Sequence, residues 1–125
     1  MAEYKGILNP VPKNRGGYEN YSTTEHEIGT WIDGSKLYEK TISFGALPNT
    51  DRKTVSHGIS NIGYIVNVVA MAVSSTQTIP LPTANPSAAN ASISAEATST
   101  EVGIRTGRDF SMYDGYFTLQ YTKTV

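Results

Sequence analysis

Apolar and polar residues alternate with a period of two along most of the chain after about residue 20. Because successive side chains of a β-strand point to opposite faces of the sheet, this alternation predicts strands. No window longer than ten residues keeps its apolar residues at helical spacing. The pattern therefore predicts an all-β protein, an antiparallel β-sandwich of about six to eight strands.

The segment IGTWIDGSKLYEKTISFG (28–45) predicts a β-hairpin. Asp33 and Gly34 supply the positive φ angles of a tight turn between two runs that are rich in apolar residues. In the second strand, every second residue from Tyr38 to Phe44 shares one face, and this face is the more apolar one. We therefore expect the strand to be buried on its Tyr38 to Phe44 side.

The most apolar stretch, YIVNVVAMAV (64–73), carries apolar residues on both alternate faces. Such a strand is typically buried on both sides, although a domain of this size rarely has two buried layers. We therefore expect one face to meet the core and the other to meet a second sheet or an identical subunit. The stretch is about half as long as a bilayer crossing requires, so we expect no membrane insertion.

The second half of the chain adds further strands. QTIPLPTANPSAAN (77–90) is rich in proline, which cannot donate to a sheet ladder, and we interpret it as a surface loop. ASISAEAT (91–98) alternates Ala and Ile with polar residues and predicts a strand. EVGIRT (101–106) and GYFTLQYTK (115–123) predict the last two strands, with GRDFSMYD as the loop between them.

Length and composition indicate the domain organisation and exclude several classes of function. The 125 residues suffice for one domain, with an N-terminal arm or linker at 1–20 and a single β-sandwich domain at 21–125. The chain has no cysteine, which excludes disulfides, thiolate zinc sites and cysteine nucleophiles. The net charge of −1, without a long cluster of Lys and Arg, argues against a nucleic-acid partner. No signal-peptide pattern opens the chain, so we expect synthesis in a cytoplasm.

Ser56 and His57 raise the question of hydrolase chemistry. Neighbouring residues on a strand point to opposite faces, and the chain has neither a G-x-S-x-G elbow nor another histidine besides His26. We therefore interpret His57 as a structural residue whose ring nitrogens bond to turn backbone. We expect no catalytic residue and no enzymatic activity.

Glu25, His26 and Glu27 are residue types that bind metals. On a strand, the two carboxylates would face one way and the imidazole the other, and no second cluster at suitable spacing completes a ligand set. We therefore expect a solvated segment before the hairpin, with no metal and no cofactor.

Aromatic residues give a better indication of function, because flat rings with a polar tip stack on sugars and fill protein interfaces. Those near predicted turns are Trp31, Tyr38, Phe110, Tyr113 and Tyr116. Trp31 and Tyr38 are also readily explained as core residues, whereas Phe110 and Tyr113 lie inside a polar loop. The predicted ligand-binding residues are Arg108, Asp109, Phe110 and Tyr113, with Trp31 and Asp33 in reserve.

Three segments of the chain resemble a known family. They are YSTTEHEIGTWIDGSKLYEKTISFGALPN (21–49), KTVSHGISNI (53–62) and IRTGRDFSMYDGYFTLQYTKT (104–124). They resemble a module at the C-terminal end of tail-fibre, tail-tip and minor structural proteins of bacteriophages and prophages, especially those of Gram-positive hosts. The resemblance covers roughly residues 18 to 124, with GTWIDG and KLYEKTI as its most specific motifs and HGISNI next, and the proline-rich middle shows no match.

The resemblance implies a component of the virion, at the tail fibre or tail tip, that is synthesised in the host bacterial cytoplasm. It implies a β-rich head at the end of a homotrimeric fibre that joins an upstream fibre or tail protein and contacts a host cell-surface saccharide or protein. HGISNI would form the turn into the long central strand, with Gly58 bending the chain and Ile59 and Ile62 entering the core. A trimer would also cover the second face of residues 64–73, and three weak saccharide contacts would gain avidity.

The residues and the resemblance are compatible with three functions. The first is a receptor-binding head, and the second is a purely structural virion module that caps, trimerises or attaches a fibre without a ligand of its own. The third is a polysaccharide-degrading tail enzyme. Such an enzyme needs a substrate groove, and this chain is short for building one.

Overall fold

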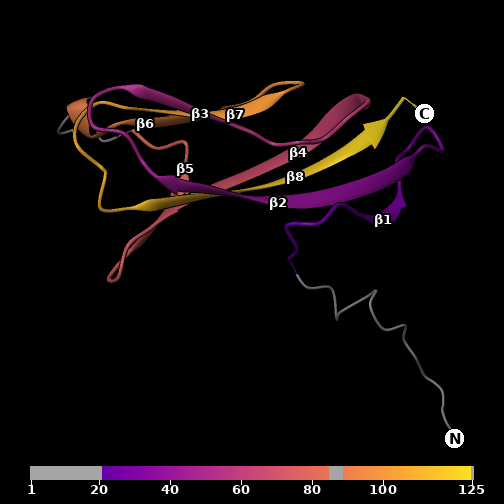
Figure 1. Cartoon of the computed structure of the whole chain (residues 1–125), viewed down its shortest axis with the longest axis horizontal. Coiled ribbons are helices and arrows are strands. Elements are labelled where there is room, and N and C mark those ends of the chain that lie inside the picture. The colour runs from indigo at the N-terminus through magenta and orange to yellow at the C-terminus, as the bar shows by residue number, and fades with distance from the viewer. Residues whose placement is uncertain (1–20, 85–88, 125) are drawn as a thin grey trace, which may run out of the picture.

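The computed structural model describes residues 21–84 and 89–124, which form eight strands and one short 3-10 turn, η1 (Ala89–Ala91) (Figure 1). The strands are β1 (His26–Thr30), β2 (Lys36–Ala46), β3 (Arg52–Ser56), β4 (Ile62–Val73), β5 (Thr78–Leu81), β6 (Ile93–Ala97), β7 (Glu101–Thr106) and β8 (Asp114–Lys123). Within these ranges, no helix has the length and apolar character that a membrane crossing requires. The predicted arm at residues 1–20 lies outside the described residues.

The strands form two antiparallel sheets, which confirms the predicted all-β fold. The five-stranded sheet has the order β1-β2-β8-β4-β5, and the three-stranded sheet has the order β3-β7-β6. Figure 1 shows the three-stranded sheet as a layer above one part of the larger sheet. Each sheet therefore has an inner face toward the other layer and an outer face directed away from it.

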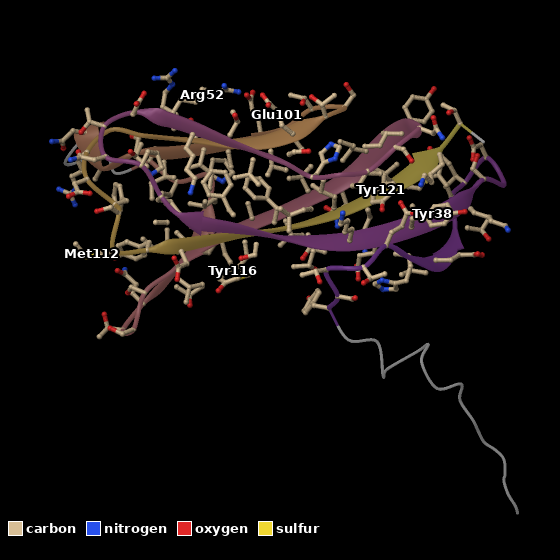
Figure 2. The ribbon with its side chains drawn as sticks, viewed as in Figure 1. Tyr38, Arg52, Glu101, Met112, Tyr116 and Tyr121 are labelled. Atoms are coloured by element: carbon tan, nitrogen blue, oxygen red, sulfur yellow. The ribbon has the colours of Figure 1, made fainter. Side chains whose placement is uncertain are left out.

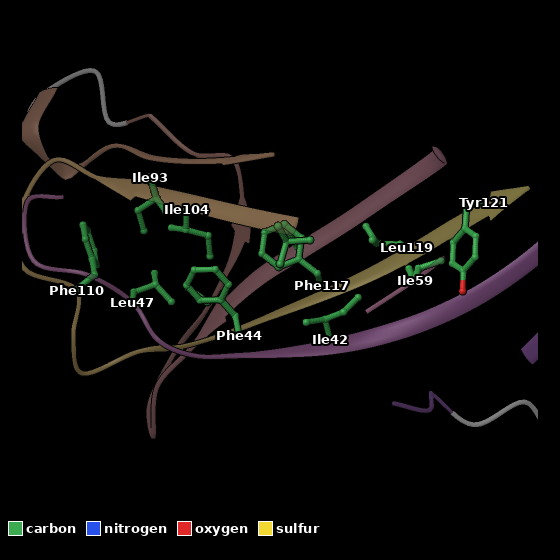
Figure 3. Close-up of a cluster of buried hydrophobic side chains, with 13 residues drawn as sticks. Ile42, Phe44, Leu47, Ile59, Ile93, Ile104, Phe110, Phe117, Leu119 and Tyr121 are labelled. Atoms are coloured by element: carbon green, nitrogen blue, oxygen red, sulfur yellow. The ribbon is translucent and has the colours of Figure 1, made fainter. Parts of the chain in front are cut away.

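The core fills the space between the two sheets (Figure 3). Its centre is the pair Phe44 and Phe117, whose ring centroids lie 5.8 Å apart. Ile104 from β7 and Leu119 from β8 are also completely or almost completely buried. Burial of each such side chain contributes about 1.5–3 kcal/mol, so this apolar contact is the main force that holds the layers together.

The predicted hairpin is confirmed, since β1 and β2 pair as antiparallel neighbours, but the positive φ predicted for Asp33 is wrong, because only Gly34 of the two turn residues has one. Gly34 has a φ of 90°, and its N–H donates to the carbonyl of Trp31 at 2.9 Å. The backbone N–H of Ser35 donates to Oδ1 of Asp33 at 2.9 Å. The expected burial of the Tyr38 to Phe44 side is also confirmed, because this side faces the core.

The HGISNI segment connects the two sheets as expected. Gly58 has a φ of 68°, in the left-handed region that favours glycine, and the chain turns there from β3 toward β4. Ile59 is buried in the core, and Ile62 packs against the core where β4 begins. The predicted roles of these three residues are therefore confirmed.

The proline-rich segment differs in part from the prediction of a surface loop. Thr78–Leu81 forms the edge strand β5, whose Ile79 and Leu81 pack against the core. An edge strand leaves one row of backbone groups unpaired, so it tolerates Pro80. Residues 85–88, which the loop prediction also included, lie outside the described residues.

The faces of β4 also differ from simple alternation. The pairing of β4 with β8 shifts its register between Ile65 and Asn67, so that Ile65 lies opposite Tyr121 and packs against the core. Such a bulge inserts one residue and reverses the alternation beyond it. Ile65 therefore joins the inner face with Ala70 and Ala72, and not the face of Val69 as strict alternation predicted.

Candidate functional site

The structure separates the predicted ligand-binding residues into two groups at opposite ends of β2. Trp31 and Asp33 lie in the hairpin turn before the first residue of β2. The loop 107–113, which carries the other four, leads into β8, and the first residue of β8 pairs with the last residue of β2. Figure 2 shows Met112 of this loop at one end of the molecule and Tyr38 near the other. The six residues therefore do not form one site.

The loop 107–113 does not display its aromatic rings in the way that the sequence suggested. Phe110 is only 7% exposed and belongs to the core, with the ring of Tyr113 edge-on at 5.6 Å. The Tyr113 hydroxyl donates to Oε1 of Gln77 at 2.7 Å. The interpretation of Phe110 as a loop residue that core packing does not explain is therefore wrong, because the loop folds its ring inward.

The charged residues of this loop mainly support its conformation. Asp109 accepts the backbone N–H of Ser111 at 2.9 Å, and hydrogen bonds from Ser111 lower the pKa of Asp109. The guanidinium of Arg108 lies 5.6 Å from the centre of the Phe110 ring. The backbone carbonyl of Arg108 accepts the N–H of Thr50 at 3.1 Å. Ligand binding by Arg108 and Asp109 stays a prediction.

The hairpin tip borders a groove of about 490 Å³, which we call the hairpin-tip groove. Its lining residues come from the turn and from the start of β4: Trp31, Ile32, Asp33, Tyr64, Ile65 and Val66. Ile32 is 89% exposed and Tyr64 is 66% exposed. The structure thus joins Trp31 and Asp33 to an aromatic residue that sequence reasoning missed, Tyr64.

His57 has the structural role that the sequence predicted. Its side chain is 2% exposed, and its Nε2 lies 2.9 Å from the carbonyl oxygen of Thr98. Its Nδ1 accepts the backbone N–H of Ile59 at 3.1 Å. The neighbouring Ser56 hydroxyl accepts the N–H of Gly58 at 3.3 Å, so each of these two side chains bonds to backbone.

Glu25 and His26 point in different directions, as expected for neighbours along an extended chain. Glu25 accepts hydrogen bonds from Lys123 at 2.9 Å and from the Tyr121 hydroxyl at 2.7 Å, whereas Nε2 of His26 lies 3.5 Å from Glu39. Burial raises the pKa of Glu25, but the bonds from Lys123 and Tyr121 outweigh burial and lower it. Burial, together with Glu25, raises the pKa of Tyr121 far above its ordinary value. Within the described residues, no group of three or more His, Cys, Asp or Glu is placed to hold a metal ion.

The outer face of the five-stranded sheet carries a group of apolar side chains, which we call the outer apolar patch. Met71 of β4 pairs with Tyr116 of β8 on one side and with Pro80 of β5 on the other. Figure 2 shows Tyr116 directed away from the three-stranded sheet. The patch consists of Val69, Met71, Val73, Pro80 and Tyr116.

The outer face of the three-stranded sheet is different. Figure 2 shows Arg52 and Glu101 on this face, directed away from the core. Its exposed side chains alternate along the strands with the buried ones, and all of them are polar or charged: Arg52, Thr54, Ser56, Ser94, Glu96 and Arg105. This is the composition of a surface that is covered by water.

No protein-family model, curated protein or solved structure matches this chain. A functional proposal therefore depends on the two surfaces described above, the hairpin-tip groove and the outer apolar patch. The resemblance to phage tail proteins that the sequence motifs suggest stays a prediction.

Proposed function

We propose that the chain is the head domain of a phage-type tail fibre. In this proposal it forms a homotrimer through the outer face of its five-stranded sheet, joins an upstream fibre or tail protein, and attaches the virion to a host cell-surface saccharide or protein. The observation that carries the proposal is the outer apolar patch. The motifs GTWIDG, KLYEKTI and HGISNI support the assignment to a virion.

Exposure of the patch favours association. Val69 is 45% exposed and Tyr116 is 37% exposed, although both lie in strands that pair with a neighbour on each side. Three copies arranged around an axis could direct their five-stranded sheets inward, and the three patches would then form a common apolar core. Each subunit would thereby gain the second buried layer that a domain of this size lacks.

The polar residues beside the patch are compatible with burial, because they bond to one another. The hydroxyls of Thr41 and Thr118 lie 2.9 Å apart. Nε2 of Gln120 donates to Glu39 at 2.9 Å, and Oε1 of the same side chain accepts Nδ2 of Asn67 at 3.4 Å. Glu39 and Thr118 are already only 8% exposed, so a second copy that covered the rest of this face would remove little further polar surface from water.

A pair of lysine substitutions on the two outer faces tests this interface. Val69→Lys places a charge in the patch, and we expect it to weaken association by at least about 100-fold, because an unpaired charge is expensive to bury. Thr54→Lys is the matched control on the outer face of the three-stranded sheet and should not change association. Sedimentation velocity of both variants gives the comparison, and equal masses for the two would contradict the proposal.

A purely structural virion module would form the same trimer and bind no saccharide. The two possibilities therefore differ only in ligand binding, which the mass of the assembly does not report. The hairpin-tip groove is where the structure allows them to be distinguished.

A further inference from the structure

We propose that the hairpin-tip groove binds a hexopyranose unit of a cell-surface saccharide, with Trp31 and Tyr64 as stacking surfaces and Asp33 as the acceptor for sugar hydroxyls. This inference rests on the receptor-binding part of the proposed function and is independent of the trimer. It places the ligand at the opposite end of the molecule from the loop 107–113, where the sequence placed the main site.

The size and exposure of the groove fit a small ligand. A volume of about 490 Å³ lies within the usual range of small-molecule sites, about 300–1,000 Å³. Exposed apolar side chains scattered singly are ordinary, but here Ile32 and Tyr64 border the same hollow. A ligand in the groove would remove both side chains from water.

The chemistry of the lining favours a sugar over an apolar peptide. A pyranose has an apolar C–H face, which stacks on aromatic rings, and an edge of hydroxyl groups that needs acceptors. Trp31 and Tyr64 provide rings, and Asp33 provides a carboxylate whose pKa is lowered by hydrogen bonds from Ser35. Among the described lining residues there is no Lys or Arg that would neutralise this carboxylate.

Both walls of the groove are held in place by backbone structure. In the turn, the N–H of Trp31 donates to the carbonyl of Ser35 at 2.8 Å, and that of Gly34 donates to the carbonyl of Trp31. On the other wall, the N–H of Tyr64 donates to Oγ1 of Thr122 at 3.0 Å, which fixes the start of β4 against β8. Walls that are ordered before the ligand arrives reduce the entropic cost of binding.

Trp31 makes the proposal directly measurable, because it is the single tryptophan of the chain. The full chain is titrated with free glucose, galactose, rhamnose, N-acetylglucosamine and N-acetylgalactosamine, while tryptophan fluorescence and saturation-transfer NMR are recorded. We expect a saturable fluorescence change with at least one of these sugars. Tyr64→Ala and Asp33→Asn should each weaken that binding by about 10-fold, the effect of losing one stacking or hydrogen-bonding contact.

Met112→Ala is the matched control, because Met112 is 72% exposed and lies at the opposite end of the molecule. It should bind the sugar as tightly as the unmodified chain. Circular dichroism of each variant checks that the fold is intact. We expect it to be, because Tyr64 and Asp33 are exposed.

The proposal is overturned if none of the sugars gives a saturable signal, or if Tyr64→Ala binds as well as the unmodified chain. A response to choline alone would also overturn it, because it would indicate recognition of a cation by the aromatic rings. Light scattering on the same samples separates the two proposals. A trimer that binds no sugar contradicts only the groove, and a monomer that binds sugar contradicts only the trimer.

Discussion

The outer faces of the two sheets differ in composition, although their inner faces pack into the same core. The outer face of the three-stranded sheet presents Arg52 and Arg105 directly opposite each other on neighbouring strands. The outer face of the five-stranded sheet presents Val69 and Met71 instead, on a strand whose other side meets the core. Strand alternation alone therefore does not decide what the outer side of a strand contacts.

The arrangement of polar groups strengthens this contrast. Arg52 and Arg105 occupy paired backbone positions, and Arg52 bonds to Glu96, so this face carries several charged side chains, which favour contact with water. On the other sheet, Gln120 bonds both to Glu39 and to Asn67, and these bonds need no water. We infer that the outer face of the three-stranded sheet is a solvent surface and that the outer face of the five-stranded sheet is an association surface.

The largest loss of stability is expected on β8, whose successive side chains face the core and the outer surface in turn. Phe117→Ala should lower the free energy of unfolding by about 3–5 kcal/mol, because its ring is fully buried against Phe44. Tyr116→Ala, its neighbour on the outer face, should cost less than about 1.5 kcal/mol when the protein is too dilute to associate. Urea denaturation of both variants gives the values, and equal losses would show that β8 does not have one core side and one surface side.

The next largest loss of stability is expected at His57, in the segment that connects the two sheets. His57→Ala should lower the free energy of unfolding by about 2–3 kcal/mol, because it creates a cavity and leaves the carbonyl of Thr98 and the N–H of Ile59 without their ring partners. Ser56→Ala removes one long hydrogen bond on an exposed residue and should cost less than about 0.5 kcal/mol. Thermal or urea unfolding measures both, and a stable His57→Ala variant would contradict the structural role.

A smaller effect should appear as a dependence of stability on pH. The folded-state pKa of Glu25 lies below the ordinary value of 4.5, so its contribution is fully present above pH 4.5 and is lost as the pH falls through the lower, folded-state pKa. Glu25→Gln should therefore be less stable than the unmodified chain at pH 7, by about 1 kcal/mol or less, since the carboxylate is partly exposed. The difference should shrink below pH 4.5, and a difference that grows with acid would refute this interpretation.

The smallest effect is expected on the solvent surface itself. The ion pair between Arg52 and Glu96 lies on exposed side chains, so its coupling energy should be below about 1 kcal/mol. A double-mutant cycle with Arg52→Ala and Glu96→Ala measures this coupling, which should decrease as salt is added. A coupling of several kcal/mol that does not depend on salt would mean that this face is covered.

Much of the fold could be predicted from the sequence, because alternation and turn residues are local signals. They identified the hairpin at Asp33-Gly34, the strand at 93–97 and the last two strands. The edge strand β5 was missed, since proline content does not reveal whether a segment lies at the edge of a sheet. The bulge after Ile65 was missed as well, because the register depends on the pairing with β8 and not on the pattern of β4 alone.

The candidate site was less predictable. Phe110 lies between polar residues in the sequence, and only the tertiary fold shows that the loop turns its ring into the core. Tyr64 belongs to an apolar strand, where an aromatic residue indicates burial, yet it lies on the exposed wall of the groove. Exposure of individual side chains depends on how the hairpin and β4 approach each other, and no local pattern contains that information.

The mass of the unmodified full chain in solution shows whether the outer apolar patch forms an interface between copies. Light scattering over a range of concentrations would determine whether the outer face of the five-stranded sheet associates. We expect a particle of three times 13.5 kDa that dissociates only on dilution. A particle of 13.5 kDa at the highest concentration would contradict it, because the outer apolar patch would then remain in contact with water.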